Sequence, residues 1–372
     1  MIEYVEIRGQ DTNVIGIIDT AQSVIWHSVY FGVGDFEVYA PATPDVLNLL
    51  LTGAFVTRPD NNEVGIIENI NISNDIENGA MIAASGRFVK SILDRRLIYK
   101  LSGHTNTPTI LRGNVENAVR EVVKNNAISC EFDRNRNIEL LALGEVANIP
   151  LKIVDTNGNT AQKQVSYENL LSYTDGVLEE YGIAATCILD GGKFKYAIYR
   201  GADRSKDNTD GNIPIVFSQE FDNLTESEYT HDTTQLKNVA LIGGAGEGVA
   251  RFYSLIENGE KDLNRREVWI DASSISRTYQ DENEEEQTYP DGEYKTMIDA
   301  KGKQDIAAFV VVESFDGVID ITNGNYVYGR DFFLGDIVTV QDNKINKYVN
   351  TRILEVTEVQ DNSGYSVDVK YQ

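Results

Sequence analysis

The chain has 372 residues, of which 33 are basic and 58 acidic, so its formal net charge is −25. A surface this negative repels nucleic-acid phosphates and anionic lipids, which disfavours a conventional DNA-binding role. No apolar run approaches the roughly 20 residues that a membrane helix needs, and residues 1–7 lack the pattern of a signal peptide. The only two cysteines, Cys130 and Cys187, are isolated, which disfavours a disulfide framework and fits synthesis in a reducing cytoplasm.

Residues 1–104 are predicted to be mainly β. Short runs of β-branched and aromatic residues alternate with turn-forming residues at 14–18, 24–30, 35–39 and 64–70. A short helix is expected after Pro44, where apolar residues form a helical stripe of Val46, Leu47, Leu50 and Leu51. Strands with one small helix indicate a small barrel or a half-open sheet, and we predict a first β-barrel-like domain here.

Residues 105–215 have helical and hairpin patterns that predict an inserted α+β module. One helix is predicted where apolar residues recur at helical spacing, at Val115, Ala118, Val119, Val122 and Val123. A second helix is expected to begin near Ser166, a good N-cap, and to end at Gly182 as its C′ glycine. The sequence Asp-Gly-Gly-Lys at 190–193 separates two β-like runs and predicts a hairpin.

Residues 216–372 return to β patterns, with a helical insertion predicted near 290–310. Three closing strands are predicted to form a meander at 337–340, 352–359 and 365–371. Two distant segments, 85–98 and 249–270, both contain Arg-Phe, a short apolar stretch and Leu-(Asp/Asn)-Arg-Arg. A duplicated unit favours two related modules, so a second β-barrel-like domain is predicted over 216–372.

Several of these segments resemble one known family. The segment Phe-Phe-Leu-Gly-Asp-Ile-Val-Thr-Val at 332–340, with its partner strand at 353–356, resembles the tail-tip (tail-associated) proteins of siphophages, which have long non-contractile tails. The segments 85–98, 243–248 and 263–271 share this resemblance. Those tail-tip proteins are similar to the baseplate hub proteins of contractile phage tails. The resemblance covers nearly the whole chain and rests on the order and spacing of the segments.

The resemblance implies an α+β, mainly β fold in which two related β-barrel-like hub domains flank the inserted module. It also implies a homotrimeric ring that adapts a sixfold tail tube to a threefold tip. The expected partners are other tail proteins, namely the distal tail ring, the tail tube and the tape measure, and DNA would pass through without specific binding. The expected role is structural and non-enzymatic, in the tail tip of a phage or prophage virion assembled in the bacterial cytoplasm.

The most conspicuous candidate for a ligand site is the glycine-rich stretch at 243–248. It follows a β-like run, as a phosphate-binding turn would. Its glycines do not match the dinucleotide fingerprint, no Gly-Lys-Ser/Thr follows, and Glu247 would place a carboxylate beside the phosphates. A turn or bulge between strands is the better interpretation.

The remaining candidates give no recognisable site, and no residue is nominated as catalytic, cofactor-binding or metal-binding. His27, His104 and His231 lack the spacing of a zinc site. A dyad of Cys187 with His231 stays open, because catalytic partners meet in space rather than in sequence. The abundance of carboxylates singles out no glycosidase pair, and the acidic stretch at 281–286 lacks the spacing of a calcium loop.

The two Leu-x-Arg-Arg motifs suggest ion pairs. Arg95 and Arg265, in a chain this acidic, are expected to bridge carboxylates within the chain or between subunits. Two rival functions stay open at this point. One is a carbohydrate- or receptor-binding tail protein, for which 19 tyrosines could supply stacking surfaces, and the other is a cell-wall hydrolase component.

Overall fold

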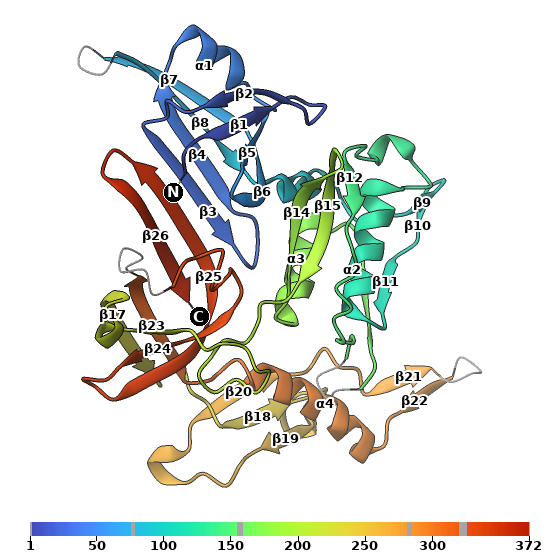
Figure 1. The fold of residues 1–372 in the computed structure, drawn as a ribbon. Helices are drawn as coiled ribbons and strands as arrows, with labels where there is room; N and C mark the ends of the chain where they lie inside the picture. The colour runs from blue at the N-terminus through green and yellow to red at the C-terminus, as the bar shows by residue number, and fades with distance from the viewer. Residues whose placement is uncertain (1, 76–78, 155–158, 281–284, 320–325, 372) are drawn as a thin grey trace. The chain divides into compact units, whose positions relative to one another are not determined.

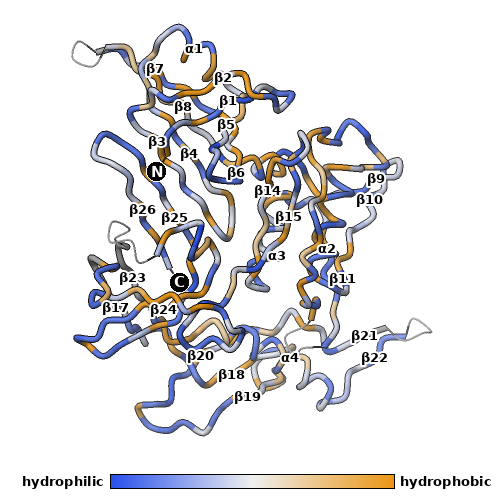
Figure 2. Tube along the Cα trace, viewed as in Figure 1, coloured by the Kyte–Doolittle hydropathy of each residue, from blue (hydrophilic) through white to orange (hydrophobic). Residues whose placement is uncertain are grey.

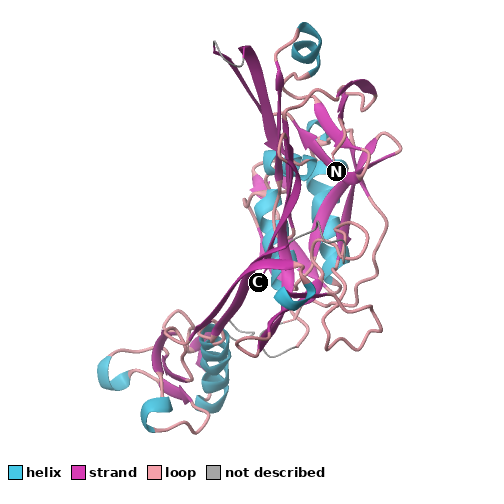
Figure 3. Cartoon of the chain, turned by 60° about the vertical axis from the view of Figure 1, so that its left-hand side comes forward, coloured by secondary structure: helices cyan, strands magenta, loops and turns pink. Residues whose placement is uncertain are grey.

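The computed structural model describes residues 2–75, 79–154, 159–280, 285–319 and 326–371 (Figure 1). The chain forms two compact units, which are described separately. The larger unit comprises the residues up to 153, residues 162–228 and the residues from 314 onward. The smaller unit comprises residues 154–161 and 229–313. Strands dominate the regular structure (Figure 3), which confirms the prediction of a mainly β protein of the α+β class.

One sheet of the larger unit has seven strands in the order β12-β15-β14-β6-β5-β1-β2. Only β12 and β15 run parallel; the other neighbours are antiparallel. The sheet joins the N-terminal strands to the hairpin β14/β15 through one register pair, Glu63 with Ile188. Its strands are β1 (Val5–Arg8), β2 (Val14–Ile18), β5 (Phe55–Arg58), β6 (Asn61–Ile66), β12 (Leu141–Leu143), β14 (Ala184–Asp190) and β15 (Lys193–Tyr199).

A second sheet follows the order β16-β24-β25-β3-β4-β8-β7, and β26 also pairs with β25. The predicted meander is confirmed as β24, β25 and β26, whereas the strand predicted at 64–70 is divided between β6 and β7. The strands are β3 (Ser23–Val29), β4 (Asp35–Pro41), β7 (Asn69–Asp75), β8 (Gly79–Arg87), β16 (Val216–Ser218), β24 (Ile337–Asp342), β25 (Lys347–Asp361) and β26 (Gly364–Tyr371).

The prediction of β-barrel-like domains is wrong for the sheets that the structure describes. The seven-stranded sheet ends at β12 and β2, and the second sheet ends at β16, at β7 and at β26, which branches from β25. A barrel requires the first and last strands to pair, and these do not. The open sheets agree with the alternative prediction, a half-open sheet. Sequence runs show where strands lie, but closure depends on pairing between strands that are distant in sequence.

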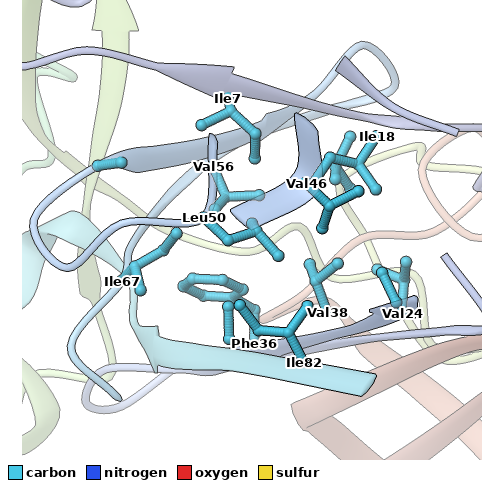
Figure 4. Packing of buried hydrophobic residues seen from close by; sticks show 14 of the residues in the cluster. Ile7, Ile18, Val24, Phe36, Val38, Val46, Leu50, Val56, Ile67 and Ile82 are labelled. Atoms are coloured by element: carbon cyan, nitrogen blue, oxygen red, sulfur yellow. The ribbon is translucent and has the colours of Figure 1, made fainter. Parts of the chain in front are cut away.

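A hydrophobic core fills the space between the N-terminal strands of these two sheets (Figure 4). Ile7, Ile18 and Val56 point from β1, β2 and β5 toward Phe36 and Val38 of β4. The short predicted helix is α1 (Pro44–Leu49), capped by Thr43. Hydrophobic residues concentrate along these strands, while the intervening turns are more hydrophilic (Figure 2). Burial of this apolar surface is the main contribution to the stability of this part of the unit.

The predicted helices of the inserted segment are present as α2 (Val115–Val123) and α3 (Leu170–Glu180). All five residues of the predicted stripe on α2 are buried. The start of α3 differs from the prediction, because Asn169 rather than Ser166 accepts the capping hydrogen bond, from the backbone N–H of Ser172. Gly182 has φ +66°, as a C′ glycine should. Short strand pairs accompany the helices: β9 (Leu101–Ser102) with β10 (Thr105–Asn106), and β11 (Thr109–Arg112) with β13 (Gln162–Val165).

The smaller unit is a three-stranded sheet packed on one helix. Strand β18 (Val239–Gly243) lies between antiparallel β19 (Tyr253–Ile256) and parallel β20 (Glu267–Asp271). Helix α4 (Asp291–Ile306) lies within the predicted insertion and buries Tyr294 and Ile298 against this sheet. The hairpin of β21 (Thr278–Gln280) and β22 (Glu286–Thr288) precedes the helix. The paired strands β17 (Leu224–Asp232) and β23 (Val312–Ile319) are each divided between the two units.

The repeat inferred from the Arg-Phe and Leu-x-Arg-Arg motifs is not a structural repeat. In the first copy, Phe88 is followed by a 3-10 helix, Val89–Arg95. In the second copy, Phe252 is followed by strand β19, and a short 3-10 turn, Asp262–Asn264, then leads into β20. Similar residues therefore adopt different local structures, because different neighbours pack against them.

Candidate functional site: a cavity beside strand β6

A cavity of about 940 Å³ lies within the larger unit. Its lining comes from the start of β6, the end of β15, strands β3, β14, β25 and β26, and the segments 200–204 and 327–336. A volume of this size falls in the range of pockets that bind small molecules or side chains. The charged residues and tyrosines of the lining are Asp60, Glu63, Tyr199, Arg200, Arg204, Tyr328, Arg330, Asp336, Glu358 and Tyr365.

Glu63 is the central titratable group of this cavity. Strand β6 places it opposite Ile188 of β14, and the Ser28 hydroxyl on β3 donates a hydrogen bond to its carboxyl. Burial raises the pKa of Glu63 to about 7, an effect that the Ser28 hydrogen bond and the charge of Lys90 reduce and that Glu358 reinforces. A carboxyl in a poorly solvated position keeps its proton to higher pH, because its charged form is disfavoured. Glu63 therefore changes charge close to neutral pH.

Two tyrosines lie close enough to Glu63 to feel its charge. Burial, and then the charge of Glu63, raise the pKa of the phenols of Tyr199 and Tyr328 far above the ordinary value for tyrosine. Tyr199 ends β15, and Tyr328 belongs to the segment before β24, so the carboxyl is approached from two sides. Both phenols stay protonated at neutral pH and can donate hydrogen bonds into the cavity.

A buried ion pair forms another part of the wall. The Arg58 guanidinium donates to both carboxylate oxygens of Glu358, each at 2.9 Å, and both side chains are almost fully buried. The same guanidinium reaches Asp60 at 2.8 and 3.0 Å and lies over the ring of Trp26. The Tyr365 hydroxyl donates to Glu358 at 2.5 Å. Since both oxygens of Glu358 already accept hydrogen bonds, this carboxylate is poorly placed to act as a general base or nucleophile.

Asp336 is a buried carboxylate that also lines the cavity. It accepts hydrogen bonds from Arg204 Nε at 2.9 Å and from the backbone N–H groups of Ala202 and Phe333 at 2.8 and 3.0 Å. These bonds join the segment 200–204 to the segment 327–336. This part of the lining is therefore held by a satisfied, charge-assisted network.

The comparisons with known proteins agree with one another. The family model of the Siphovirus ReqiPepy6 Gp37-like protein matches residues 4–370. The chain belongs to this family. A search of the curated proteins found no match for this Gp37-like protein. The family match confirms the resemblance to siphophage proteins.

Three solved structures share the fold of this Gp37-like protein. They are the 43 kDa tail protein of prophage MuSo2 from Shewanella oneidensis, a tail protein from Neisseria meningitidis and the prophage tail protein gp18 from Listeria monocytogenes. Each is 12% identical to the chain, with TM-scores of 0.59, 0.56 and 0.52 respectively. The alignments cover 100%, 99% and 98% of this chain and 98%, 95% and 94% of the three others. The chain thus shares its fold with these three tail proteins.

No histidine or cysteine is among the described residues that line the cavity. His27 lies between Asp35 and Glu355, each at 3.1 Å, and His231 contacts Glu313 at 3.1 Å. Cys130 and Cys187 are both buried, and burial raises the pKa of the Cys187 thiol to about 12. A thiol with so high a pKa does not form the thiolate that a nucleophile needs, which argues against a Cys187 dyad.

The glycine-rich stretch of this Gp37-like protein forms a turn. The Gly244 N–H donates to the Phe252 carbonyl at 2.7 Å, and the Ala245 N–H donates to the Tyr294 hydroxyl at 2.7 Å. A phosphate-binding loop needs free amides and a following α-helix, whereas here only a short 3-10 turn, Gly248–Ala250, follows. The interpretation as a turn between strands is therefore supported.

Both motif arginines form ion pairs within the chain, as expected, and the contacts of Arg265 are the shorter ones. Arg265 bridges Glu257 at 2.9 Å and Glu267 at 2.6 Å, while Arg95 approaches Glu68 only to 3.8 Å. The acidic stretch at 281–286 lies mostly outside the described residues. Among the described residues, no group of three His, Cys, Asp or Glu side chains could hold a metal ion. None of the described helices is both long and apolar enough to cross a bilayer.

Sequence reasoning missed the cavity residues entirely. Arg58 ends β5, Glu63 directly precedes the apolar residues of β6, and Glu358 lies within β25. Charged residues at strand positions whose neighbours are buried are uncommon unless they are paired, and this was the available signal. The signal does not say that these three residues meet, because that depends on the pairing of β3 with β25.

Proposed function

We propose that this Gp37-like protein is a structural tail-tip hub of a phage or prophage. Three copies would form a ring at the distal end of the tail tube, adapt its sixfold symmetry to a threefold tip and let DNA pass. The observation that carries the proposal is the family match over residues 4–370, together with the prophage tail-protein fold over nearly the full length of three structures. The hub-domain boundaries at 1–104, 105–215 and 216–372 belong to this proposal.

An exposed sheet edge supports assembly. Strand β2 is an end strand of the seven-stranded sheet, and Ile15 and Ile17 on it are 50% and 52% exposed. An apolar edge strand with unpaired backbone groups tends to recruit another strand or surface. A contact of this kind, between an edge of one copy and a different surface of the next, generates a closed ring when the rotation closes.

The charge of the protein suits the proposed passage of DNA. With a net charge of −25, the ring as a whole would repel the phosphate backbone rather than hold it. Such a conduit needs no sequence recognition and no chemistry of its own. The proposed partners are accordingly other tail proteins, the distal ring, the tail tube and the tape measure.

The solution mass tests the assembly, and Ile17→Lys tests the edge. We expect a mass three times the 41.4 kDa of one chain, with a central hole in electron micrographs, because β2 is covered by a neighbouring copy. Ile17→Lys should reduce the mass to that of a monomer, because a lysine cannot be buried unpaired in the contact. Leu263→Lys, at a fully exposed position of the smaller unit, is the matched control and should leave the mass unchanged. A wild-type monomer at every concentration would contradict the homotrimer.

One observation favours a second candidate, carbohydrate or receptor binding. Leu241, Tyr253, Leu255 and Trp269 are 43–51% exposed on the face of the small sheet opposite α4. Trp269 lies across Gly243, where a Cβ would be 2.1 Å from the ring, and the Arg251 guanidinium stacks over it at 5.0 Å. Exposed aromatic rings beside charged groups are a common stacking surface for sugars and for partner proteins.

A glycan array decides between the two candidates. If the sheet face binds sugars, the wild-type protein should bind one class of bacterial glycan, and Trp269→Ala should lose most of that binding. Leu263→Ala serves as the control for an exposed apolar residue away from the face. No binding by either protein would leave the structural role alone, and equal binding by the wild type and by Trp269→Ala would exclude this sheet face as the binding surface.

A further inference from the structure

We propose that the cavity beside β6 receives a lysine or arginine side chain of a partner polypeptide, whose cation pairs with the carboxylate of Glu63. This inference concerns a site within one unit of one chain, so it holds whether or not three copies form a ring. It names the chemistry of a partner that the tail-tip role leaves open. Four observations carry it: the charge balance of the cavity, its aromatic walls, its size and the state of Glu63.

The charge balance leaves one carboxyl without a cation. Arg58 is shared between Asp60 and Glu358, and Arg204 is taken by Asp336. Lys90, the other cation near Glu63, is held by Asp175 at 3.0 Å. Within the described part of the chain, Glu63 has a hydrogen bond from Ser28 but no ion pair. An added cation would therefore complete the set of partners rather than compete for one.

The walls of the cavity suit an organic cation better than a metal ion. Tyr199, Tyr328, Phe333 and Tyr365 all line it. Aromatic faces attract ammonium and guanidinium groups and also contact the apolar stem of a lysine or arginine. Two exposed arginines at the rim, Arg200 and Arg330, oppose the entry of a cation, but water screens them, and Arg330 is paired with Asp331 at 2.8 Å.

The size of the cavity indicates a side chain carried by a protein segment. A volume of about 940 Å³ exceeds what one side chain fills, so the backbone of a loop or chain end would enter with it. A chain with a net charge of −25 also steers basic partners toward itself over long distances. A second copy of this acidic chain is for the same reason a poorer source than a different, basic tail protein.

The protonation state of Glu63 couples the binding to pH. The groups that face it are Ser28 on β3, Arg58 on β5, Lys90 on the 3-10 helix, Tyr199 on β15 and Glu358 on β25, together with Tyr328. Since the pKa of Glu63 is about 7, the carboxyl is largely protonated at mildly acidic pH and must release a proton when the cation binds. Affinity should therefore rise with pH across neutrality and then level off.

The experiment uses the full chain and small probes. N-acetyl-lysine methylamide and N-acetyl-arginine methylamide supply the cation and its stem, and N-acetyl-norleucine methylamide is the neutral control. Calorimetric titrations in two buffers of different ionisation enthalpy give both the affinity and the proton released. We expect millimolar binding of at least one cationic probe, at least about tenfold tighter than the neutral one, with proton release that fades toward alkaline pH.

Two variants assign the binding to Glu63. Glu63→Gln keeps the shape and the Ser28 hydrogen bond and should weaken the cationic probe by about tenfold or more while removing the proton release. Glu121→Gln, at an exposed position of α2, should change neither. Equal affinity for cationic and neutral probes, or unchanged binding by Glu63→Gln, would overturn the inference. If Glu63→Gln does not fold, the pH dependence and proton release of the wild type decide. Loss of the trimer without loss of probe binding would count against the proposed function alone.

Discussion

Replacing Arg58 by methionine is expected to destabilise the larger unit by roughly 3–5 kcal/mol at neutral pH. The change leaves Glu358 buried without its bidentate partner, and an uncompensated buried charge is expensive. It also removes the cation over the buried ring of Trp26. Urea unfolding followed by Trp26 fluorescence, in a Trp269→Phe background that silences the second tryptophan, measures this effect in the unit concerned.

Two controls separate charge from packing. The double variant Arg58→Met with Glu358→Met removes both charges, and it should be less destabilising than Arg58→Met alone, because no unpaired charge remains. Arg330→Met removes an arginine that is 65% exposed and paired with Asp331, and it should change stability little. If the double variant is as unstable as the single one, the packing of the two stems rather than their ion pair supports the wall.

Replacing Glu63 by glutamine is expected to stabilise the protein at alkaline pH. The pKa of Glu63 is about 7 in the folded chain, against 4.5 for an ordinary glutamate, so the folded state holds a proton that the unfolded state releases. The stability that Glu63 provides is complete below pH 4.5 and is lost as the pH rises through 7. Glutamine stays neutral and avoids this loss, which amounts to about 1–3 kcal/mol, because water in the cavity reduces the full effect of the pKa difference.

Unfolding curves at several pH values test the sign. The free energy of unfolding of Glu63→Gln relative to the wild type should rise between mildly acidic and mildly alkaline pH and stay level beyond it. Groups with lowered pKa, such as Asp60 and Glu355, act equally in both proteins and cancel in the difference. Glu121→Gln should show no such trend. A difference that falls with pH would mean that Glu63 is ionised and stabilising in the folded state.

Local features of the fold could be predicted from the sequence. The hairpin at Asp190 to Lys193 forms because Gly191 and Gly192 take φ values of +56° and +72°, which glycine adopts without strain. The spacing of apolar residues on α2 and the turn before Gly364 were likewise sufficient for their elements. These features depend on residues within one or two turns of chain, where propensity and periodicity act directly.

Tertiary features were beyond the sequence. The prediction of β-barrels was wrong because the residues of a strand do not indicate which other strand will pair with it. The prediction of a structural repeat was wrong because the segments that follow Phe88 and Phe252 adopt different secondary structures. The cavity could not be predicted for the same reason, because Arg58, Glu63 and Glu358 come from three different strands. The resemblance to tail proteins, which rested on many segments rather than on one motif, was confirmed by the family match over residues 4–370.

The pairing of β25 with β3 has a consequence for synthesis on the ribosome. His27 on β3 contacts Glu355 on β25, although 328 residues separate them in the chain. Until β25 has been translated, β3 lacks one of its two partner strands, and the cavity lacks the lining residue Glu358. Long-range β pairing of this kind slows folding and leaves the nascent chain open to aggregation. We therefore expect a ribosome-stalled chain lacking β25 to need chaperones. The high negative charge would oppose aggregation of such chains with one another.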